Sequence, residues 1–406
     1  MSTRILHVLD HSVPLQSGYA FRTLSLLREQ RALGWDTFQL TTPKHYAPGP
    51  MEEEVAGFRF HRTRTQSVLA RVPGVDAAAI VLATAKRIEE LMPRIRPDII
   101  HAHSPCLNGL AALRAARKAG IPVVYEMRAS WEDAAVDHGT TREGSLRYRL
   151  SRRLETYVLR RASAVATICG GLADEIRARG VPDERIAVVP NGVDVEDFEV
   201  IDRTDGALRG ELALGEGPVL GFIGSLYGYE GIDLLIRALP RIAAEFPGAR
   251  VLLVGGGPAE AELKRLAEDL GVGGRVRFAG RVPHESVRRF YSVIDALVYP
   301  RISIRLTEMV TPLKPLEAMS LGRLFIASDV GGHRELVPES LRRYMFRAGD
   351  LEDLARAASL LLNERSQWPA LAAGARRYVV EQRTWRRSVS QYVKIYSQNV
   401  PRLAAA

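Results

Sequence analysis

Short apolar segments and amphipathic helical segments alternate along this chain in two successive series. The first series begins with ILHVL at residues 5–9, and the second begins with VLGFI at residues 219–223. Strands that are continuously apolar are typical of parallel sheets in which both faces are covered. Their alternation with helices at this spacing predicts doubly wound sheets. We therefore expect an α/β chain with two Rossmann-like doubly wound parallel-sheet domains.

The domain boundaries follow from the length and from one turn signature. A chain of 406 residues is longer than one core usually accommodates. The run NGVD at 191–194 separates the two series. We predict an N-terminal domain over 1–195, a C-terminal domain over 196–383 and a helical tail over 384–406. The polar, proline-rich stretch 43–57 is expected to be a loop.

Composition restricts the partners and the compartment. The formal net charge of +9 favours an anionic partner, and both nucleic acid and anionic lipid are compatible with it. The two cysteines, Cys106 and Cys169, lie far apart in apolar surroundings and are expected to be buried thiols. We find neither a signal core nor an apolar run near membrane-spanning length. These features predict a cytoplasmic protein.

The stretch 299–332 is expected to form a loop, a helix and a buried strand. Thr311 is expected to be the N-cap of that helix, with Pro312 at the first helical position. Exposed amides at the start of the helix create a positive potential that suits a diphosphate. Lys314 and Glu317 are three residues apart and share a helix face. A cation for phosphate beside a carboxylate for hydroxyl groups is what a nucleotide-sugar site requires.

Three motifs carry a resemblance to a known family. The run TPLKPLEAMSLGRLFIASDVGGHREL at 311–336 resembles the donor-site signature of family 4 retaining glycosyltransferases. The runs ILHVLDHSVPLQSGYAFRT at 5–23 and GSLYGYEGIDLLIRALP at 224–240 extend the match over essentially the whole chain. More narrowly, the chain resembles the exopolysaccharide subgroup found beside bacterial exosortase (PEP-CTERM sorting) systems.

The resemblance implies a fold and a reaction. The fold is GT-B, in which two Rossmann-like domains face a central cleft. The C-terminal domain binds the donor, the N-terminal domain binds the acceptor, and the tail packs back on the N-terminal domain. The reaction moves a sugar, with retention, from a nucleotide diphosphate sugar to a hydroxyl group of a lipid-linked or polysaccharide acceptor. The donor is expected to be UDP- or GDP-linked. The chain contains no D-x-D motif, so we expect a metal-independent enzyme without a cofactor.

Two glutamates of the second domain match sugar-binding positions of the family. Glu317 corresponds to the residue that binds the ribose hydroxyls, and a carboxylate can accept two hydrogen bonds from a vicinal diol. The family position that contacts the donor sugar is occupied by Met309, and Glu308 stands one residue earlier. We assign Glu308 to this role, with an exposed loop charge as the alternative.

Two phosphate-binding cations of the family are missing. The family commonly has Arg and Lys in a loop resembling GRLxxxKG, but the run GSLYGYEG places Ser225 and Glu230 at those positions. A diphosphate without compensation is costly to desolvate. We expect Lys314, Arg305 and Arg301 to compensate it, and surface solvation is the alternative for the two arginines.

The first domain contributes residues from three strand ends. Gly18 matches the position where the backbone approaches the donor phosphates, with an ordinary turn glycine as the alternative. His103 corresponds to the family histidine that faces the donor sugar. Glu126 and Arg128 are expected either to bind acceptor hydroxyls or to form an internal ion pair. Arg22 is expected to face the cleft, or else to be a surface charge.

The predicted site residues fall into three groups. Those assigned to catalysis are His103, Glu308 and Lys314. Those assigned to the donor are Gly18, Ser225, Arg301, Arg305, Thr311, Pro312, Leu313, Lys314 and Glu317. Those assigned to the acceptor are Arg22, Glu126 and Arg128. No metal ligand is assigned, because His101 and His103 are expected on opposite faces of their strand without further ligands nearby.

The segment 142–161 breaks the alternation with a strongly basic amphipathic helix. It holds seven arginines and two glutamates. Its arginines are expected to contact anionic lipid headgroups and bring the enzyme to a lipid-linked acceptor at the inner face of the membrane. The alternative is a solvated helix at the edge of the first domain.

Three other classes of protein remain to be weighed against a transferase. A nucleotide-sugar epimerase would share the fold. A dehydrogenase would require the glycine fingerprint that GGGP at 255–258 lacks. A nucleic-acid-binding protein would fit the charge, but basic residues do not interleave with aromatic ones. We therefore expect no nucleic acid partner.

Overall fold

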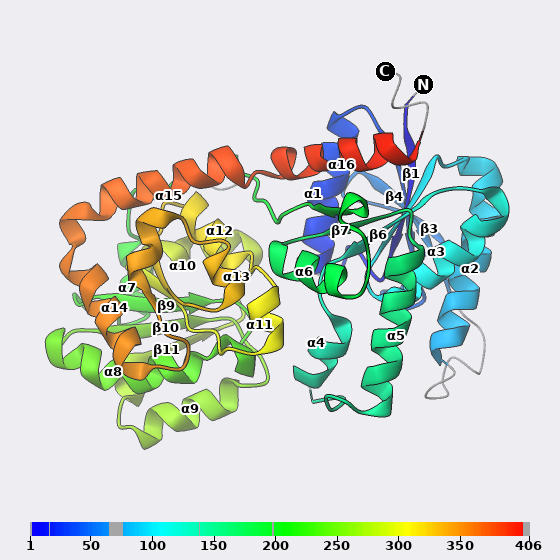
Figure 1. Ribbon diagram of the computed structural model, residues 1–406. Coiled ribbons are helices and arrows are strands. Elements are labelled where there is room, and N and C mark those ends of the chain that lie inside the picture. Colours follow the sequence, from blue (N-terminus) through cyan, green and yellow to red (C-terminus); the bar gives the residue numbers. More distant parts are fainter. Residues whose placement is uncertain (1, 16, 65–75, 138, 197–198, 401–406) are drawn as a thin grey trace. The chain divides into compact units, whose positions relative to one another are not determined.

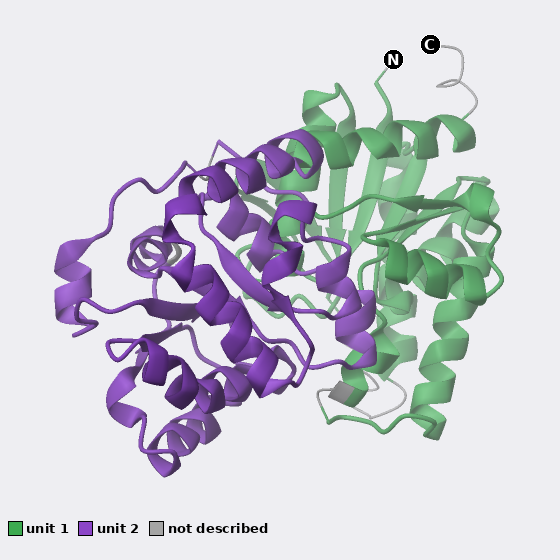
Figure 2. Cartoon of the chain, turned by 60° about the vertical axis from the view of Figure 1, so that its left-hand side comes forward, with its two compact units in different colours: residues 1–191, 385–406 green, residues 192–384 purple. Residues whose placement is uncertain are grey.

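The computed structural model describes residues 2–15, 17–64, 76–137, 139–196 and 199–400. The chain forms two compact units, which Figure 2 shows in different colours. The first unit comprises residues 1–191 and 385–406, and the second comprises residues 192–384. The chain leaves the first unit inside the NGVD turn. Residues 401–406 of the predicted tail lie outside the described residues.

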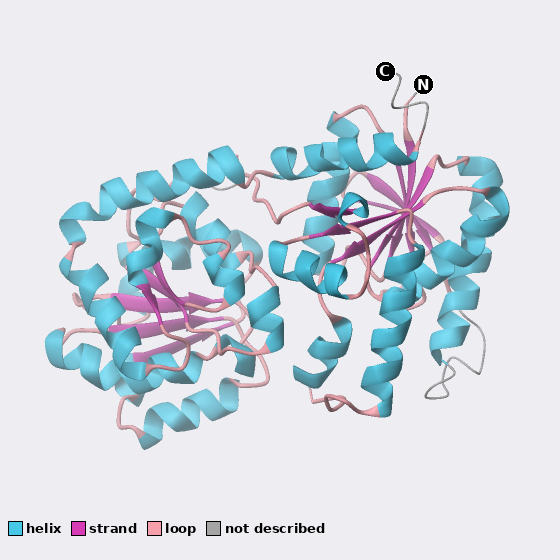
Figure 3. Cartoon of the chain, in the orientation of Figure 1, coloured by secondary structure: helices cyan, strands magenta, loops and turns pink. Residues whose placement is uncertain are grey.

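The described part of the first unit contains one eight-stranded sheet with the order β3-β4-β2-β1-β5-β6-β7-β8. The strands are β1 (Arg4–Leu9), β2 (Asp36–Thr41), β3 (Glu52–Val55), β4 (Phe58–Arg62), β5 (Ile99–His103), β6 (Val123–Met127), β7 (Ala164–Thr167) and β8 (Ile186–Val188). The helices are α1 (Gly18–Ala32), α2 (Asp76–Ile95), α3 (Cys106–Ala119), α4 (Trp131–Asp137), α5 (Leu146–Arg161), α6 (Gly170–Ala178) and α16 (Trp385–Asn399). Every residue of β5, β6 and β7 is buried, as expected for strands covered on both faces (Figure 3).

The prediction of a loop over 43–57 is wrong in its second half. Strand β3 pairs antiparallel with β4, and the two enclose a turn at Ala56 and Gly57. Both turn residues have positive φ, 52° and 77°, which a tight hairpin of the type I′ class requires. Three consecutive glutamates make β3 look like a loop, but charges of this kind are common on an edge strand.

The C-terminal helix α16 belongs to the first unit, where it packs on α1 (Figure 1). Its side chains Tyr392 and Tyr396 are fully buried. The hydroxyl group of Tyr396 lies 2.7 Å from Nδ1 of His101 on β5. A segment at the end of the chain therefore completes the interior of the unit formed by its beginning.

The described part of the second unit contains a six-stranded parallel sheet with the order β11-β10-β9-β12-β13-β14. The strands are β9 (Val219–Ile223), β10 (Arg250–Val254), β11 (Val276–Gly280), β12 (Ala296–Tyr299), β13 (Phe325–Ser328) and β14 (Met345–Phe346). The α-helices are α7 (Gly206–Glu211), α8 (Ile232–Glu245), α9 (Glu260–Asp269), α10 (Val287–Val293), α11 (Arg305–Met309), α12 (Lys314–Ser320), α13 (Gly331–Arg334), α14 (Leu351–Asn363) and α15 (Trp368–Gln382). The 3-10 helix η3 (Gly228–Glu230) follows β9.

The predicted helix of the donor stretch begins later than expected. Helix α12 begins at Lys314, with Leu313 at its N-cap position, so the predicted capping by Thr311 is wrong. A helix that began at Pro312 would place Pro315 where an amide must donate to the preceding turn. Beginning at Lys314 puts Pro315 in the first turn, where no such amide is required. The loop expected before it contains the short helix α11.

Candidate functional site

Three charged side chains meet beyond the carboxyl ends of β9 and β12, which are neighbours in the sheet of the second unit. Arg301 donates two hydrogen bonds to Glu230, from Nε to Oε2 and from Nη2 to Oε1, each 3.2 Å long. Nζ of Lys314 lies 2.5 Å from Oε1 of the same carboxylate. In doubly wound folds, ligands bind at this edge of the sheet. We call Glu230, Arg301 and Lys314 the donor-side cluster.

The donor-side cluster is enclosed and charged. Glu230 is 2% exposed and Arg301 is 9% exposed. Burial acts to raise the pKa of Glu230, but the ammonium group of Lys314 and the guanidinium group of Arg301 outweigh it and lower that pKa to about 2. Burial lowers the pKa of Lys314, and the carboxylate of Glu230 opposes that effect. The cluster therefore carries two positive charges and one negative charge.

Two glycines allow the lysine to reach this position. Gly224 has a φ of 146°, and a Cβ at this residue would lie 2.3 Å from Cε of Lys314. Gly255 has a φ of 129°, and its Cβ would lie 1.9 Å from the carbonyl oxygen of Gly224. The loops after β9 and β10 therefore pack backbone to backbone beneath the lysine. GGGP at 255–258 is a tight turn here, as we interpreted it from the sequence.

Glu317 lies one helical turn after Lys314 and is half-buried. The hydroxyl group of Tyr291 donates to its Oε2 at 3.4 Å. Tyr299 of β12 donates to the carbonyl oxygen of Lys314 at 3.2 Å. Two buried tyrosines thus hold the first turn of α12 from the interior of the unit.

The other donor residues predicted in this unit lie in different surroundings. Glu308 accepts hydrogen bonds from the amide of Gly331 at 2.7 Å and from Nη2 of Arg334 at 2.9 Å, so it holds the start of α13. Its other oxygen accepts from Ser303 at 2.7 Å, which fixes the loop before α11. Thr311 and Pro312 are buried, Leu313 is half-buried, and Ser225 and Arg305 are exposed.

A second charged cluster lies inside the first unit, around Glu126 at the end of β6. Its Oε1 accepts from Nε of Arg22 at 3.1 Å and from Nε of Arg128 at 2.8 Å. Its Oε2 accepts from the hydroxyl group of Tyr392. Arg22 also donates to the side chain of Asn191 at 2.7 Å. Burial opposes ionisation of Glu126, but the two guanidinium groups hold its pKa well below the ordinary value.

This geometry decides between the two interpretations of Glu126 and Arg128. Glu126 is fully buried, and Arg22 and Arg128 are 3% and 7% exposed. The three side chains form an internal ion cluster, so the prediction that they bind acceptor hydroxyls is corrected. Glu126 has no exposed surface and accepts hydrogen bonds from two guanidinium groups and a tyrosine, so it does not face a solvent-borne sugar.

Two of the three histidines beside Glu126, His103 and His7, form a directed hydrogen-bond chain. Nη2 of Arg128 donates to Nδ1 of His103 at 2.7 Å, which leaves the proton of His103 on Nε2. That proton goes to Nδ1 of His7 at 2.9 Å, and Nε2 of His7 donates to Gln30 at 2.8 Å. Burial lowers the pKa values of His7, His101 and His103, so all three rings are neutral.

The expectation that His101 and His103 occupy opposite strand faces is wrong. Residues i and i+2 of a strand share a face. The two rings stack with centroids 4.2 Å apart, and His7 on the neighbouring strand completes the group. Their ring nitrogens are close enough for a metal ion. However, the guanidinium group of Arg128 donates to one of these nitrogens, and that disfavours a second cation.

Gly18 is the first residue of α1, directly after the capping residue Ser17. A Cβ at Gly18 would meet no described protein atom within 4 Å. The fold of the described residues therefore does not itself require glycine at this position. The reason suggested by the sequence, close approach of a ligand, stays a prediction.

The basic segment forms helix α5, and part of its apolar surface faces outward. Tyr148, Glu155, Val158 and Leu159 are buried against the unit, whereas Leu146, Leu150 and Tyr157 are 79%, 56% and 49% exposed. Arg149 and Arg153 are exposed between them. None of the helices in the described residues has the length and hydropathy needed to cross a membrane.

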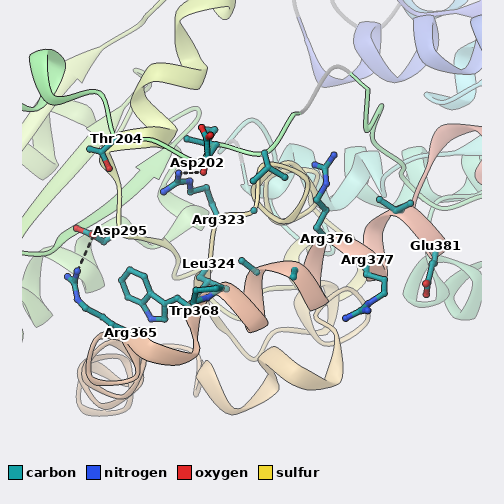
Figure 4. A pocket seen from close by; sticks show the side chains of 17 residues that line it. Asp202, Thr204, Asp295, Arg323, Leu324, Arg365, Trp368, Arg376, Arg377 and Glu381 are labelled. Carbon is teal, nitrogen blue, oxygen red and sulfur yellow. Dashed lines mark hydrogen bonds and ion pairs between the residues drawn. The ribbon is translucent and has the colours of Figure 1, made fainter.

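A cavity of about 860 Å³ lies elsewhere in the second unit (Figure 4). It is bounded by α15, the segment 200–204 and the residues just before β12 and β13. Arg365 extends across Trp368 toward Asp295 in this cavity. The cavity is thus at the amino ends of the strands, the opposite edge of the sheet from the donor-side cluster.

Solved structures identify the class to which this architecture belongs. The sucrose-phosphate synthase of Thermosynechococcus elongatus superposes with a TM-score of 0.76 at 20% identity, over 99% of this chain and 100% of that chain. HepE of Anabaena, in complex with UDP, superposes with a TM-score of 0.73 at 18% identity, over 100% of both chains. At these identities the likeness shows the fold, which is the GT-B fold of glycosyltransferases.

Family models give the more particular assignment. Residues 17–192 match the glycosyl transferase 4-like domain, and residues 217–364 match the glycosyl transferases group 1 domain. The chain belongs to the glycosyltransferase family that these two domains define.

Two curated relatives support the same family. D-inositol 3-phosphate glycosyltransferase of Nocardia farcinica is 29% identical over 66% of this chain and 60% of its own length. Sulfoquinovosyl transferase SQD2 of Arabidopsis thaliana is 26% identical over 92% of this chain and 69% of its own length. The match thus spans less than two thirds of the length of the first of these relatives.

Proposed function

We propose that this protein is a retaining glycosyltransferase that moves a sugar from a nucleotide diphosphate sugar to an acceptor hydroxyl group. The observation that carries the proposal is the donor-side cluster at the carboxyl edge of the second sheet, where Arg301 and Lys314 meet at Glu230 and Glu317 follows Lys314 by one helical turn. Cations for phosphate and a carboxylate for ribose there form the core of a nucleotide-sugar site. The UDP bound to HepE supports a nucleotide ligand.

The chemistry we assign needs no covalent intermediate. Lys314 and Arg301 stabilise the departing diphosphate, and Glu317 holds the ribose hydroxyls. The leaving phosphate accepts the proton of the attacking hydroxyl on the same face of the sugar, which gives retention. Glu308 positions the donor sugar, whereas the role predicted for His103 is corrected, because His103 is fully buried and both of its ring nitrogens are bonded inside the first unit. The two cations do the work of a bridging metal, so we propose a metal-independent enzyme without a cofactor.

We further propose that the second unit binds the donor and that the first unit binds the acceptor. The acceptor we propose is a lipid-linked glycan or growing exopolysaccharide, as the exosortase-associated subgroup implies. The exposed apolar and arginine side chains of α5 support contact with an anionic bilayer surface. In this proposal the protein is cytoplasmic and peripheral at the inner face of the cell membrane.

A thermal-shift panel tests the nucleotide site, because a ligand that binds the folded state raises the melting temperature. We expect UDP or GDP to stabilise the protein and NAD to have no effect. Glu317→Ala and Lys314→Ala should each weaken the shift, whereas Lys264→Ala, which removes an exposed lysine of α9, should leave it unchanged. Equal shifts in all variants would show that the site is misplaced.

A second measurement separates a transferase from an epimerase. The enzyme is incubated with the donor that binds, first alone and then with a lipid-linked acceptor. A transferase leaves the sugar configuration of the unused donor unchanged and extends the acceptor. A new free sugar formed from donor alone would point to an epimerase instead.

A further inference from the structure

Glu230 is an acidic residue at the point where the two cations of the donor-side cluster converge. Its two carboxylate oxygens accept from both Arg301 and Lys314, at 2.5–3.2 Å. Glu230 therefore offsets about half of the positive charge that the phosphates of a donor would meet. The family resemblance implies a phosphate-binding lysine at this position, but the residue here is a carboxylate in direct contact with Arg301 and Lys314.

The backbone around Glu230 packs tightly against the loop that carries Arg301. Glu230 ends η3, and the following Gly231 has a φ of 68°. A Cβ at Gly231 would lie 2.0 Å from the carbonyl oxygen of Pro300, so this loop packs tightly against the loop after β12. Arg301 directly follows Pro300 and also lies over the ring of Tyr229, 5.8 Å from its centroid. The packing of these two loops thus brings the acid and the arginine side by side.

We propose that Glu230 makes the site discriminate between donor and product by charge. The inference depends on the proposed function, because it concerns the same diphosphate site. A sugar nucleotide carries two negative charges on its diphosphate, whereas the free nucleoside diphosphate carries about three above pH 7. A resident carboxylate repels the ligand with the greater charge more strongly. Glu230 therefore weakens retention of the product more than binding of the donor, and it speeds release after each transfer.

Glu230→Gln tests this proposal directly, since it keeps the size of the side chain and removes its charge. The dissociation constants of UDP, UDP-glucose, GDP, GDP-mannose and inorganic pyrophosphate are measured by calorimetry at pH 8. Whichever nucleoside diphosphate and sugar ester of the same base bind the wild-type protein are then compared. The dissociation constant of the sugar ester divided by that of the free diphosphate is the donor-to-product ratio. We expect the substitution to tighten the free diphosphate about tenfold more than its sugar ester, and to tighten pyrophosphate as well. Product inhibition should increase by a similar factor.

Two further variants keep the test decisive. Asp233→Asn removes an exposed acid three residues away, which pairs with Arg237, and should leave the ratio unchanged. The double variant Glu230→Gln with Lys314→Met restores the original net charge of the cluster. If charge is the cause, its donor-to-product ratio returns toward the wild-type value even though overall affinity falls.

The outcomes separate this inference from the proposed function. One outcome is that the wild-type protein binds a nucleotide but Glu230→Gln leaves the donor-to-product ratio unchanged or shifts it in the opposite direction. This outcome would overturn the role of Glu230 and leave the glycosyltransferase proposal intact. Equal tightening of donor and product would also overturn it, because discrimination is the claim. If the wild-type protein binds none of the nucleotides and transfers no sugar, the proposed function itself fails.

Discussion

Glu126→Gln should destabilise the first unit strongly. The carboxylate is fully buried and shared by Arg22 and Arg128, at 3.1 and 2.8 Å. An amide keeps the shape but leaves two buried guanidinium groups without their common counter-charge. Removing one partner of a buried ion pair typically costs about 3–5 kcal/mol. In a unit of this size each kcal/mol lowers the melting temperature by about 2–4 °C, so we expect a fall of about 6–20 °C.

Hydrogen exchange followed by mass spectrometry measures this loss where it occurs. A peptide that covers β6 (Val123–Met127) reports the first unit, and a peptide that covers β9 (Val219–Ile223) serves as an internal reference in the second. The opening free energy of β6 should fall in Glu126→Gln, while that of β9 stays constant.

The matched control is Glu90→Gln, which removes an exposed carboxylate that pairs with Arg87 at 3.1 Å. Surface pairs of this kind contribute about 0.2–1 kcal/mol, so β6 should change little. If Glu126→Gln lowers the opening free energy of β6 by less than about 1 kcal/mol, the ion cluster does not support the unit as we argue.

Three further predictions follow from single residues. Gly224→Ala should abolish nucleotide-induced thermal stabilisation while the protein stays folded by circular dichroism, because the new Cβ would displace Lys314; an undiminished shift would contradict this. Burial raises the pKa of Glu155 from 4.5 to about 7, so its contribution to stability is complete below about pH 4.5 and is lost as the pH rises through 7. The difference in unfolding free energy between wild type and Glu155→Gln should therefore change between pH 4.5 and 7, and a constant difference would refute the assignment. Tyr396→Phe removes a hydroxyl group that contacts His101 at 2.7 Å and Gln30 at 3.2 Å, and should cost about 1–3 kcal/mol in urea denaturation; a loss below about 0.5 kcal/mol would argue against it.

Local pattern was sufficient for much of the fold. The helix predicted over the amphipathic tail is α16, and the buried strand predicted at 219–223 is β9. Both depend on the periodicity of apolar residues within one segment, which a sequence displays directly. The hairpin of β3 and β4 was missed because its glutamates are stabilised by edge position and by pairing, and neither is a local property.

The errors in the candidate site have the same cause, because contacts between residues far apart in sequence are not visible in a local pattern. Glu230 was noticed only as a missing cation, because its partner Arg301 lies 71 residues away in sequence. Glu126 accepts a hydrogen bond from Tyr392, which lies 266 residues later in the sequence. The late start of α12 was in principle predictable, since Pro315 is visible in the sequence and disfavours a helix that begins at Pro312.

The sequence by itself determined the two parallel-sheet units, the basic character of α5 and the presence of Lys314 and Glu317 on one helix, because each is set by residue types at short spacing. Only the tertiary structure decided which charges neutralise one another. Ion pairs form between strand ends that the fold brings together, and burial then fixes their protonation. That is why Glu126 proved to be an internal counter-ion and Glu230 a member of the site.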